Sequence, residues 1–206
     1  MKSKISLLFL FLLTIFKTQA QSQCFADCRE RAASDWEKLK SKGITSTDSA
    51  LEINHKILSD LKGCAFPSIQ LNRLDDKKFA IKELKGNIVF VHFWFTSCAT
   101  CIAEIPSINQ LHKLYENKKV KFLAVSFNDK NNIKAFSKKH GPFESIQTSI
   151  EQKLLEEKFC VIDGYPLNLV LDKNGNVIDA WYEENPDSSK QDAFYTKVKK
   201  LIDDNL

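Results

Sequence analysis

Residues 87–106 read NIVFVHFWFTSCATCIAEIP, and the two halves of this stretch follow different patterns. Residues 87–95 are apolar on both alternating faces, as is typical of a central strand covered on both sides. Apolar residues then recur at helical spacing, which predicts a helix over Ile102–Tyr115. Cys98 and Cys101 lie between these two elements. The sequence therefore predicts a buried strand that runs into a helix, with two cysteines at the junction.

Further strand and helix patterns surround this stretch. We predict strands over 120–127, 167–171 and 177–182, and helices over 133–140, 150–159 and 192–202. Residues 172–175, DKNG, are typical of a tight hairpin turn between the last two strands. Residues 67–84 read as a hairpin of short elements, and residues 24–61 as helical. This order predicts an α/β fold in which a central mixed sheet is flanked by helices.

The composition fits one main domain with a small appendage. The chain has 206 residues, of which 43% are apolar and 27% are charged, as in globular proteins. We expect a signal peptide over residues 1–20, a helical N-terminal extension over 21–62 and the main domain over 63–206.

The first twenty residues have the features of a secretory signal peptide. Lys2 and Lys4 precede an apolar run over 5–16, and Thr18-Gln19-Ala20 puts small residues at the −3 and −1 positions. We therefore expect cleavage near Ala20 and a periplasmic or otherwise exported protein. A retained N-terminal anchor is the weaker interpretation, because a membrane helix needs about 18 apolar residues. No later stretch is long and apolar enough to span a membrane.

Removal of the leader leaves a nearly neutral protein. Its three lysines reduce the 30 basic residues to 27, against 26 acidic residues, so the net charge falls from +4 to +1. This small excess predicts no nucleic-acid partner.

The Cys98-Ala99-Thr100-Cys101 motif predicts disulfide exchange. At the start of a helix, unpaired backbone N–H groups and the helix dipole stabilise an anion, here the Cys98 thiolate. The thiolate is the nucleophile in exchange, and Cys101 lies one turn further on, where it can resolve a mixed disulfide. The alternative is half of a zinc site, which needs about four ligands. The chain has no second Cys-x-x-Cys and its histidines are scattered, so we predict no metal and no cofactor beyond the redox-active disulfide.

Two further residues are candidates for proton transfer near the dithiol. Glu104 follows Cys101 by three residues, one helical turn away, and is either a proton-exchanging group or a solvated helix acid. His92 shares a strand face with Trp94 and is either a proton acceptor for Cys101 or a hydrogen-bonded core histidine.

The other four cysteines form an even set, for which we expect a structural role; a second redox pair that relays electrons to Cys98 is the weaker alternative. Pairing Cys24 with Cys28 is awkward, because side chains four apart on a helix are stacked rather than facing. An N-terminal cysteine bridged to Cys64 would tie the extension to the domain, and Cys160 is a second possible partner of Cys64. The sequence leaves the connectivity open.

Residues 93–106, FWFTSCATCIAEIP, resemble the active-site stretch of the thioredoxin superfamily, and within it the exported TlpA/ResA-like thiol-disulfide oxidoreductases. Residues 63–67 and 84–86 resemble the N-terminal β-hairpin of that group. Residues 165–167 and 171–175 resemble its cis-proline strand and hairpin. The resemblance covers residues 63–206.

The resemblance implies a thioredoxin fold and an enzyme that reduces protein disulfides, with roles in cell redox homeostasis and cytochrome c maturation. Cys98 would be the attacking thiol and Cys101 the resolving thiol, with Glu104 tuning them. Tyr165, a cis Pro166 and Trp94 would bind the substrate. The expected partners are disulfide-bearing client proteins and a membrane electron donor of the DsbD/CcdA type. Ser97, Thr100 and Tyr165 depart from the residues usual in the family, which bears on redox potential and partner choice.

Two alternative functions on the same fold are a thiol peroxidase and a copper- or haem-maturation chaperone. Peroxiredoxins carry Pro-x-x-x-Thr/Ser-x-x-Cys, but Val91 and Phe95 occupy the Pro and Thr/Ser positions before Cys98. A metal chaperone would need a third ligand beside Cys98 and Cys101.

Overall fold

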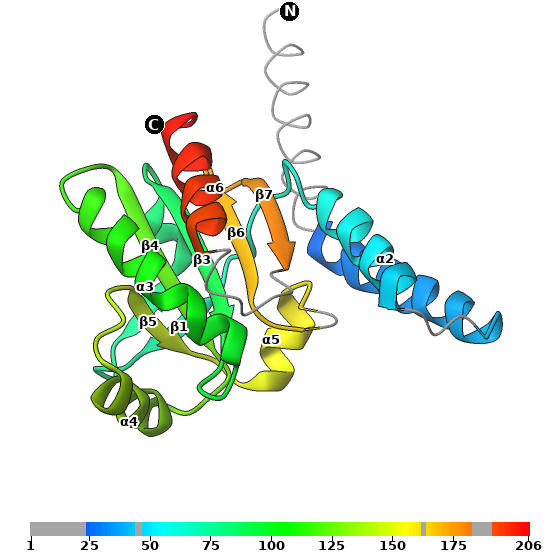
Figure 1. Ribbon diagram of the computed structural model, residues 1–206, viewed down its shortest axis with the longest axis horizontal. Coiled ribbons are helices and arrows are strands. Elements are labelled where there is room, and N and C mark those ends of the chain that lie inside the picture. The colour runs from blue at the N-terminus through cyan, green and yellow to red at the C-terminus, as the bar shows by residue number, and fades with distance from the viewer. Residues whose placement is uncertain (1–23, 44–46, 162–163, 183–190) are drawn as a thin grey trace, which may run out of the picture.

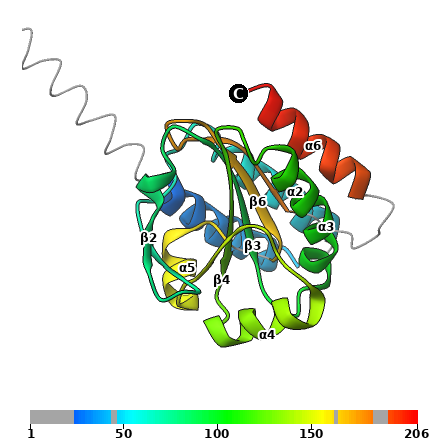
Figure 2. The ribbon, with the colours of Figure 1, turned by 90° about the vertical axis from the view of Figure 1, so that its left-hand side faces the viewer.

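The computed structural model describes residues 24–43, 47–161, 164–182 and 191–206 (Figure 1). Within these ranges a single mixed sheet of seven strands carries helices on both faces (Figure 2). This architecture confirms the predicted α/β fold, including the short hairpin that precedes the central strand. The predicted signal peptide and its cleavage site lie outside the described residues.

The strands are β1 (Gln70–Arg73), β2 (Lys78–Ala80), β3 (Ile88–Trp94), β4 (Val120–Ser126), β5 (Ile146–Ser149), β6 (Leu167–Leu171) and β7 (Val177–Tyr182). The helices are α2 (Thr47–Ser59), α3 (Ala99–Leu114), α4 (Lys130–His140), α5 (Gln152–Lys158) and α6 (Gln191–Asp203), with a short 3-10 turn η1 (Ile81–Leu84). An N-terminal helix over residues 24–41 precedes α2. No described helix combines the length and the apolar character needed to cross a membrane.

Strand β3 lies near the middle of the sheet, whose order is β2-β1-β5-β4-β3-β6-β7. It pairs in parallel with β4 and antiparallel with β6. All seven of its residues are buried, as the apolar run predicted.

The side chains of β3 alternate between two cores. Val89, Val91 and Phe93 pack into a core that also contains residues of the N-terminal helices and α5. Phe90 and Trp94 pack on the opposite face, against α3, α4 and α6. Figure 2 shows α3 and α6 on one side of the sheet and α5 on the other. Because both faces of β3 are covered, its C-terminal end has a fixed position, and the cysteine motif begins there.

The helix predicted over residues 150–159 is present as α5, but the strand that precedes it was not predicted. Residues Ile146–Ser149 form β5, and helix α5 begins only at Gln152. The four residues of β5, IQTS, have no apolar alternation that would indicate a strand. Its conformation depends on backbone pairing with β4 and β1, and the Thr148 hydroxyl also donates to the Ala124 carbonyl at 3.0 Å.

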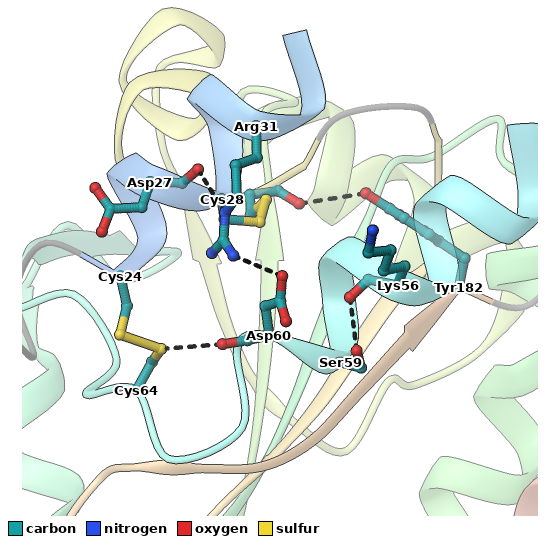
Figure 3. Close-up of a disulfide and its surroundings, with 10 residues drawn as sticks. Cys24, Asp27, Cys28, Arg31, Lys56, Ser59, Asp60, Cys64 and Tyr182 are labelled. Carbon is teal, nitrogen blue, oxygen red and sulfur yellow. Dashed lines mark hydrogen bonds and ion pairs between the residues drawn. A yellow bond between two sulfur atoms is a disulfide. The ribbon is translucent and has the colours of Figure 1, made fainter. Parts of the chain in front are cut away.

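Two disulfides attach the N-terminal helix to the main domain, and Figure 3 shows the bond between Cys24 and Cys64. Cys24 is bonded to Cys64, with their Cα atoms 5.8 Å apart, and Cys28 to Cys160, with 6.0 Å between Cα atoms. Cys28 and Cys160 are fully buried. This connectivity answers the question that the sequence left open, and Cys160 pairs with Cys28 rather than with Cys64.

The N-terminal helix over residues 24–41 also forms an ion pair with the residue that follows α2. Arg31 Nη1 lies 2.6 Å from Asp60 Oδ2, just beyond the last residue of α2 (Figure 3). Both side chains are substantially exposed, so the pair contributes little compared with the disulfides. Buried apolar side chains of the N-terminal helices, among them Phe25, Ala32 and Leu58, also pack into the core on this face, so hydrophobic packing and the two crosslinks together attach the helices.

We expect the two crosslinks to contribute unequally to stability. The Cys28–Cys160 bond spans 132 residues and the Cys24–Cys64 bond 40 residues, and a longer closed loop restricts the unfolded chain more. The double variant Cys28→Ala/Cys160→Ala should lower the free energy of unfolding by roughly 4–5 kcal/mol, and Cys24→Ala/Cys64→Ala by about one kcal/mol less. Urea unfolding of both variants measures this order, and a larger loss in the Cys24/Cys64 variant would contradict it.

Candidate active site

Cys98 is the N-cap residue of α3, directly after the turn that follows β3. Its backbone is extended, with φ −80° and ψ 105°, and its Sγ accepts a hydrogen bond from the Cys101 N–H at 3.2 Å. Its carbonyl accepts a hydrogen bond from the Ile102 N–H at 3.0 Å. The sulfur therefore takes the place of the side-chain oxygen that usually caps a helix. In the reduced protein, the same N–H group and the helix dipole favour the thiolate form.

Cys98 and Cys101 form a disulfide whose Cα atoms are 5.3 Å apart. The two residues differ in access, since Cys98 is 6% exposed and Cys101 is 0% exposed. An incoming sulfur can therefore reach Cys98 first, and Cys101 is available only from within the protein.

Asn128 stabilises the turn between β3 and α3, a role that the sequence did not indicate. Its Oδ1 accepts a hydrogen bond from the Thr96 N–H at 2.7 Å and another from the Ser126 hydroxyl at 3.3 Å. Ser126 ends β4, the parallel neighbour of β3. The carboxyl ends of two adjacent strands are thus joined just before Cys98.

Tyr165 precedes a cis peptide bond to Pro166, the isomer that the family resemblance implied. The Tyr165 ring packs against Phe95 and Phe127, with ring centroids 5.2 and 5.7 Å apart, and the latter two rings are 5.4 Å apart. All three side chains are half-buried. Burial, assisted by the Glu156 carboxylate, raises the pKa of Tyr165, so its hydroxyl stays protonated at physiological pH. Phe95 also accepts a backbone hydrogen bond from Cys98, so this aromatic cluster borders the motif.

Trp94, expected to bind substrate, is instead part of the core. It is 0% exposed, and its ring packs edge-on against Phe136 and Phe143. Alternation along β3 directs Trp94 to the face covered by α3 and α4. This corrects the expectation, because a client chain has no access to the side chain.

Glu104, His92 and Asn168 form a buried polar cluster one turn along α3 from Cys101. Asn168 Nδ2 lies 3.1 Å from each carboxyl oxygen of Glu104, and His92 Nδ1 lies 2.8 Å from Asn168 Oδ1. His92 Nδ1 is also 3.3 Å from Glu104 Oε2. All three side chains are buried. The structure thus brings together both candidates for proton transfer and adds an amide.

The burial of His92 decides its charge. Desolvation lowers the pKa of His92 to about 4, although the hydrogen bond with Asn168 acts in the opposite direction. The ring is therefore neutral at neutral pH, and its contact with Glu104 is not an ion pair under those conditions.

Asn168 was missed because its strand was read only for its apolar character. The sequence feature that indicates its role is an amide inside the apolar run LNLVL, two residues after Pro166. A polar residue enclosed by apolar ones needs hydrogen-bond partners in the core, and Asn168 finds them in residues distant in sequence. Across the described ranges, no three His, Cys, Asp or Glu side chains are grouped so as to hold a metal ion.

Residues 62–204 match the sequence model of the AhpC/TSA family. The chain belongs to the AhpC/TSA family. Among curated relatives, thiol-disulfide oxidoreductase ResA of Bacillus thuringiensis is 29% identical over 114 residues, which are 55% of this chain and 65% of ResA. ResA of Geobacillus thermodenitrificans is 28% identical over 116 residues, 56% of this chain and 66% of ResA. The matched region thus spans just under two thirds of these relatives.

Solved structures confirm the thioredoxin fold of this AhpC/TSA family member. The thioredoxin domain of a thiol-disulfide oxidoreductase from Bacteroides vulgatus superposes with a TM-score of 0.58 at 21% identity, over 68% of this chain and 97% of that domain. A thiol:disulfide interchange protein of the thioredoxin family from Chlorobium tepidum gives 0.55 at 25% identity, over 67% and 95%. The ResA matches confirm the predicted relationship to ResA-like proteins.

The neutral state of His92 predicts a specific loss of stability in acid. Its pKa is about 4 in the folded protein and near 6.5 when unfolded, so between these values the unfolded chain binds more protons. The contribution of the neutral ring to the free energy of unfolding is therefore fully present above pH 6.5. Up to about 3 kcal/mol of it is lost as the pH drops toward 4. Urea unfolding at pH 7 and pH 4.5 measures this loss. Between the two pH values, the free energy of unfolding should decrease less for His92→Asn than for the wild type.

The matched control is His140→Asn, because His140 is exposed. This variant should keep the pH dependence of the wild type. An equal decrease in His92→Asn and the wild type would contradict the burial argument.

Proposed function

We propose that this protein is an exported thiol-disulfide oxidoreductase that reduces protein disulfides through Cys98 and Cys101. The observation that carries the proposal is the position of Cys98 as N-cap of α3, with its Sγ hydrogen-bonded to the Cys101 N–H and more accessible than Cys101. This arrangement favours one nucleophilic sulfur and keeps its partner within bonding distance. The ResA matches support the same chemistry over the region that they cover.

The reaction begins when the Cys98 thiolate attacks one sulfur of a client disulfide. A Cys98–client disulfide forms, and the other client cysteine leaves as a thiolate that takes a proton from water. The Cys101 thiol then gives up its proton, and its thiolate attacks Cys98 Sγ. The second client cysteine leaves and is protonated in turn. The client gains two electrons and two protons, and the Cys98–Cys101 disulfide remains.

Glu104 is the proposed acceptor of the Cys101 proton. The two residues are three apart on α3, so they lie on neighbouring turns of the same face, and both are buried. Water has little access there, so a protein group must take the proton. His92 Nδ1 lies 3.3 Å from Glu104 Oε2, close enough to donate to the carboxyl oxygen as a second donor beside Asn168.

The site where a client binds is proposed to be the loop of Tyr165 and Pro166. Tyr165 belongs to the half-buried aromatic cluster with Phe95 and Phe127, next to the turn that carries Cys98. An apolar surface beside the accessible sulfur suits an extended client segment around its cysteine.

Export and electron supply complete the proposal. The leader over residues 1–20 is interpreted as a signal peptide cleaved near Ala20, which delivers the protein to the periplasm or another oxidising compartment. A reductase there must be reduced again after each turnover, so we propose a membrane electron donor of the DsbD/CcdA type. Cysteines of apocytochrome c and mispaired disulfides are the proposed clients.

An insulin-reduction assay tests this function. Cys98→Ser should lower the rate to the uncatalysed level, because the attacking sulfur is gone. Cys101→Ser should still attack but stop at the mixed disulfide, which non-reducing electrophoresis detects as a covalent adduct. The control is Ser68→Ala, an exposed serine outside the motif, which should keep the activity.

Peroxide consumption, measured on the same samples, distinguishes the proposed reductase from a thiol peroxidase, the main alternative. A wild-type protein that consumes peroxide but does not reduce insulin would replace the proposed reductase by a thiol peroxidase. Copper retained after purification through Cys98 and Cys101 would instead favour a metal chaperone.

A further inference from the structure

Asn168 lies directly opposite His92 in the sheet. The antiparallel register of β3 and β6 pairs His92 with Asn168, so the backbone itself determines that these side chains are neighbours. Glu104 reaches the same place from α3, which covers this face. The remaining residues of β6 are apolar and buried. A buried amide without hydrogen bonds would destabilise the fold, and the Asn168 amide avoids this cost because it is hydrogen-bonded to His92 and Glu104.

The hydrogen bonds of Asn168 determine which nitrogen of His92 carries the proton. A carboxylate only accepts hydrogen bonds, so the group 3.1 Å from both Glu104 oxygens is the Asn168 NH₂. The Asn168 carbonyl oxygen therefore faces His92 Nδ1 at 2.8 Å and requires a proton on that nitrogen. Because the ring is neutral, Nε2 carries no proton.

The environment of the His92 ring keeps this arrangement rigid. The ring stacks on Phe90 and meets the edge of Phe143, with centroid distances of 6.4 and 5.8 Å. His92 Nε2 is buried and has no hydrogen-bond partner among the described residues. The orientation of the imidazole is therefore set by Asn168 and Glu104 on one side and by two phenyl rings elsewhere.

We infer that Asn168 is a positioning residue for proton transfer, which holds the Glu104 carboxylate toward its helix neighbour Cys101 and fixes His92 as the Nδ1–H tautomer. This inference rests on the proposed function. Burial disfavours a charged carboxylate at this place, whereas hydrogen bonds from the amide N–H and the His92 Nδ1–H favour it. These hydrogen bonds therefore support Glu104 in its proposed role as acceptor of the Cys101 proton.

The pH dependence of the second step follows from the groups that meet here. Among the described residues, the titratable groups of this place are Glu104 and Cys101 on α3 and His92 on β3, whereas β6 contributes the Asn168 amide and the segment before β5 the Phe143 ring. Removing the amide leaves the carboxylate less stabilised, so it holds a proton up to a higher pH. The rate at which Cys101 resolves the mixed disulfide should then need a higher pH to reach its maximum.

The test compares Asn168→Leu with the wild type by two measurements. Nitrogen-15 NMR of the imidazole in the oxidised protein should show the Nδ1–H tautomer in the wild type and loss of that preference in Asn168→Leu. Single-turnover resolution of the mixed disulfide at pH 7 should slow by about tenfold, a part of what proton transfer contributes, and its pH profile should move upward.

Asn168→Asp separates the two hydrogen bonds of the amide. It keeps an acceptor for His92 Nδ1–H but replaces the N–H donor to Glu104, so the tautomer should remain while the pH profile still moves upward. Thr148→Val is the matched control, since it removes another buried polar group of the sheet, a hydroxyl that donates to the Ala124 carbonyl. This control should change neither the tautomer nor the profile.

Folded Asn168 variants with the wild-type tautomer and the wild-type pH profile would overturn the inference. Should Asn168→Leu fail to fold, an unshifted profile in Asn168→Asp would overturn it equally. A wild-type protein that reduces no disulfide would instead refute the proposed function, and the tautomer measurement would still decide whether Asn168 fixes His92.

Discussion

The hydrogen bond from the Cys101 N–H to Cys98 Sγ is the interaction on which the chemistry of this protein depends. It exists because a strand buried on both faces ends at Trp94, four residues before Cys98, and a helix of sixteen residues begins directly after Cys98. The Asn128 side chain, from the end of the neighbouring strand, fastens the intervening turn. A sulfur at this position replaces the usual oxygen cap and gains a favourable site for negative charge. The same geometry makes Cys98 the outer and Cys101 the inner member of the pair.

The sheet also determines what surrounds the inner cysteine. The register of β3 with β6 puts a histidine opposite an asparagine, and α3 adds a glutamate from above the same face. On the other face, two disulfides attach the N-terminal helix, and one of them ends at Cys160, five residues before the cis peptide bond of Tyr165–Pro166. The loop beside the dithiol is thus connected covalently to the extension, which the family resemblance did not cover.

The sequence was informative where one segment alone determines the structure. The run before Cys98 and the apolar spacing after Cys101 were sufficient to predict β3 and α3, although α3 begins at Ala99 and therefore includes Cys101. Strand β5 was missed because its polar residues depend on pairing with two other strands. Trp94 was assigned to the wrong environment, since its position in the motif says nothing about the helices that cover it. The role of Asn168 and the pairing of four cysteines depend on contacts between distant segments, which spacing along the chain does not reveal.

The most direct measurement of the central claim is the relative reactivity of the two motif thiols. The protein is reduced, treated briefly with iodoacetamide at pH 7, and the modified cysteines are quantified by mass spectrometry. If the helix N-terminus stabilises the outer sulfur, Cys98 should be alkylated at least about tenfold faster than Cys101, because only thiolates react and Cys101 is enclosed. Equal rates for the two cysteines, or faster modification of Cys101, would contradict the account.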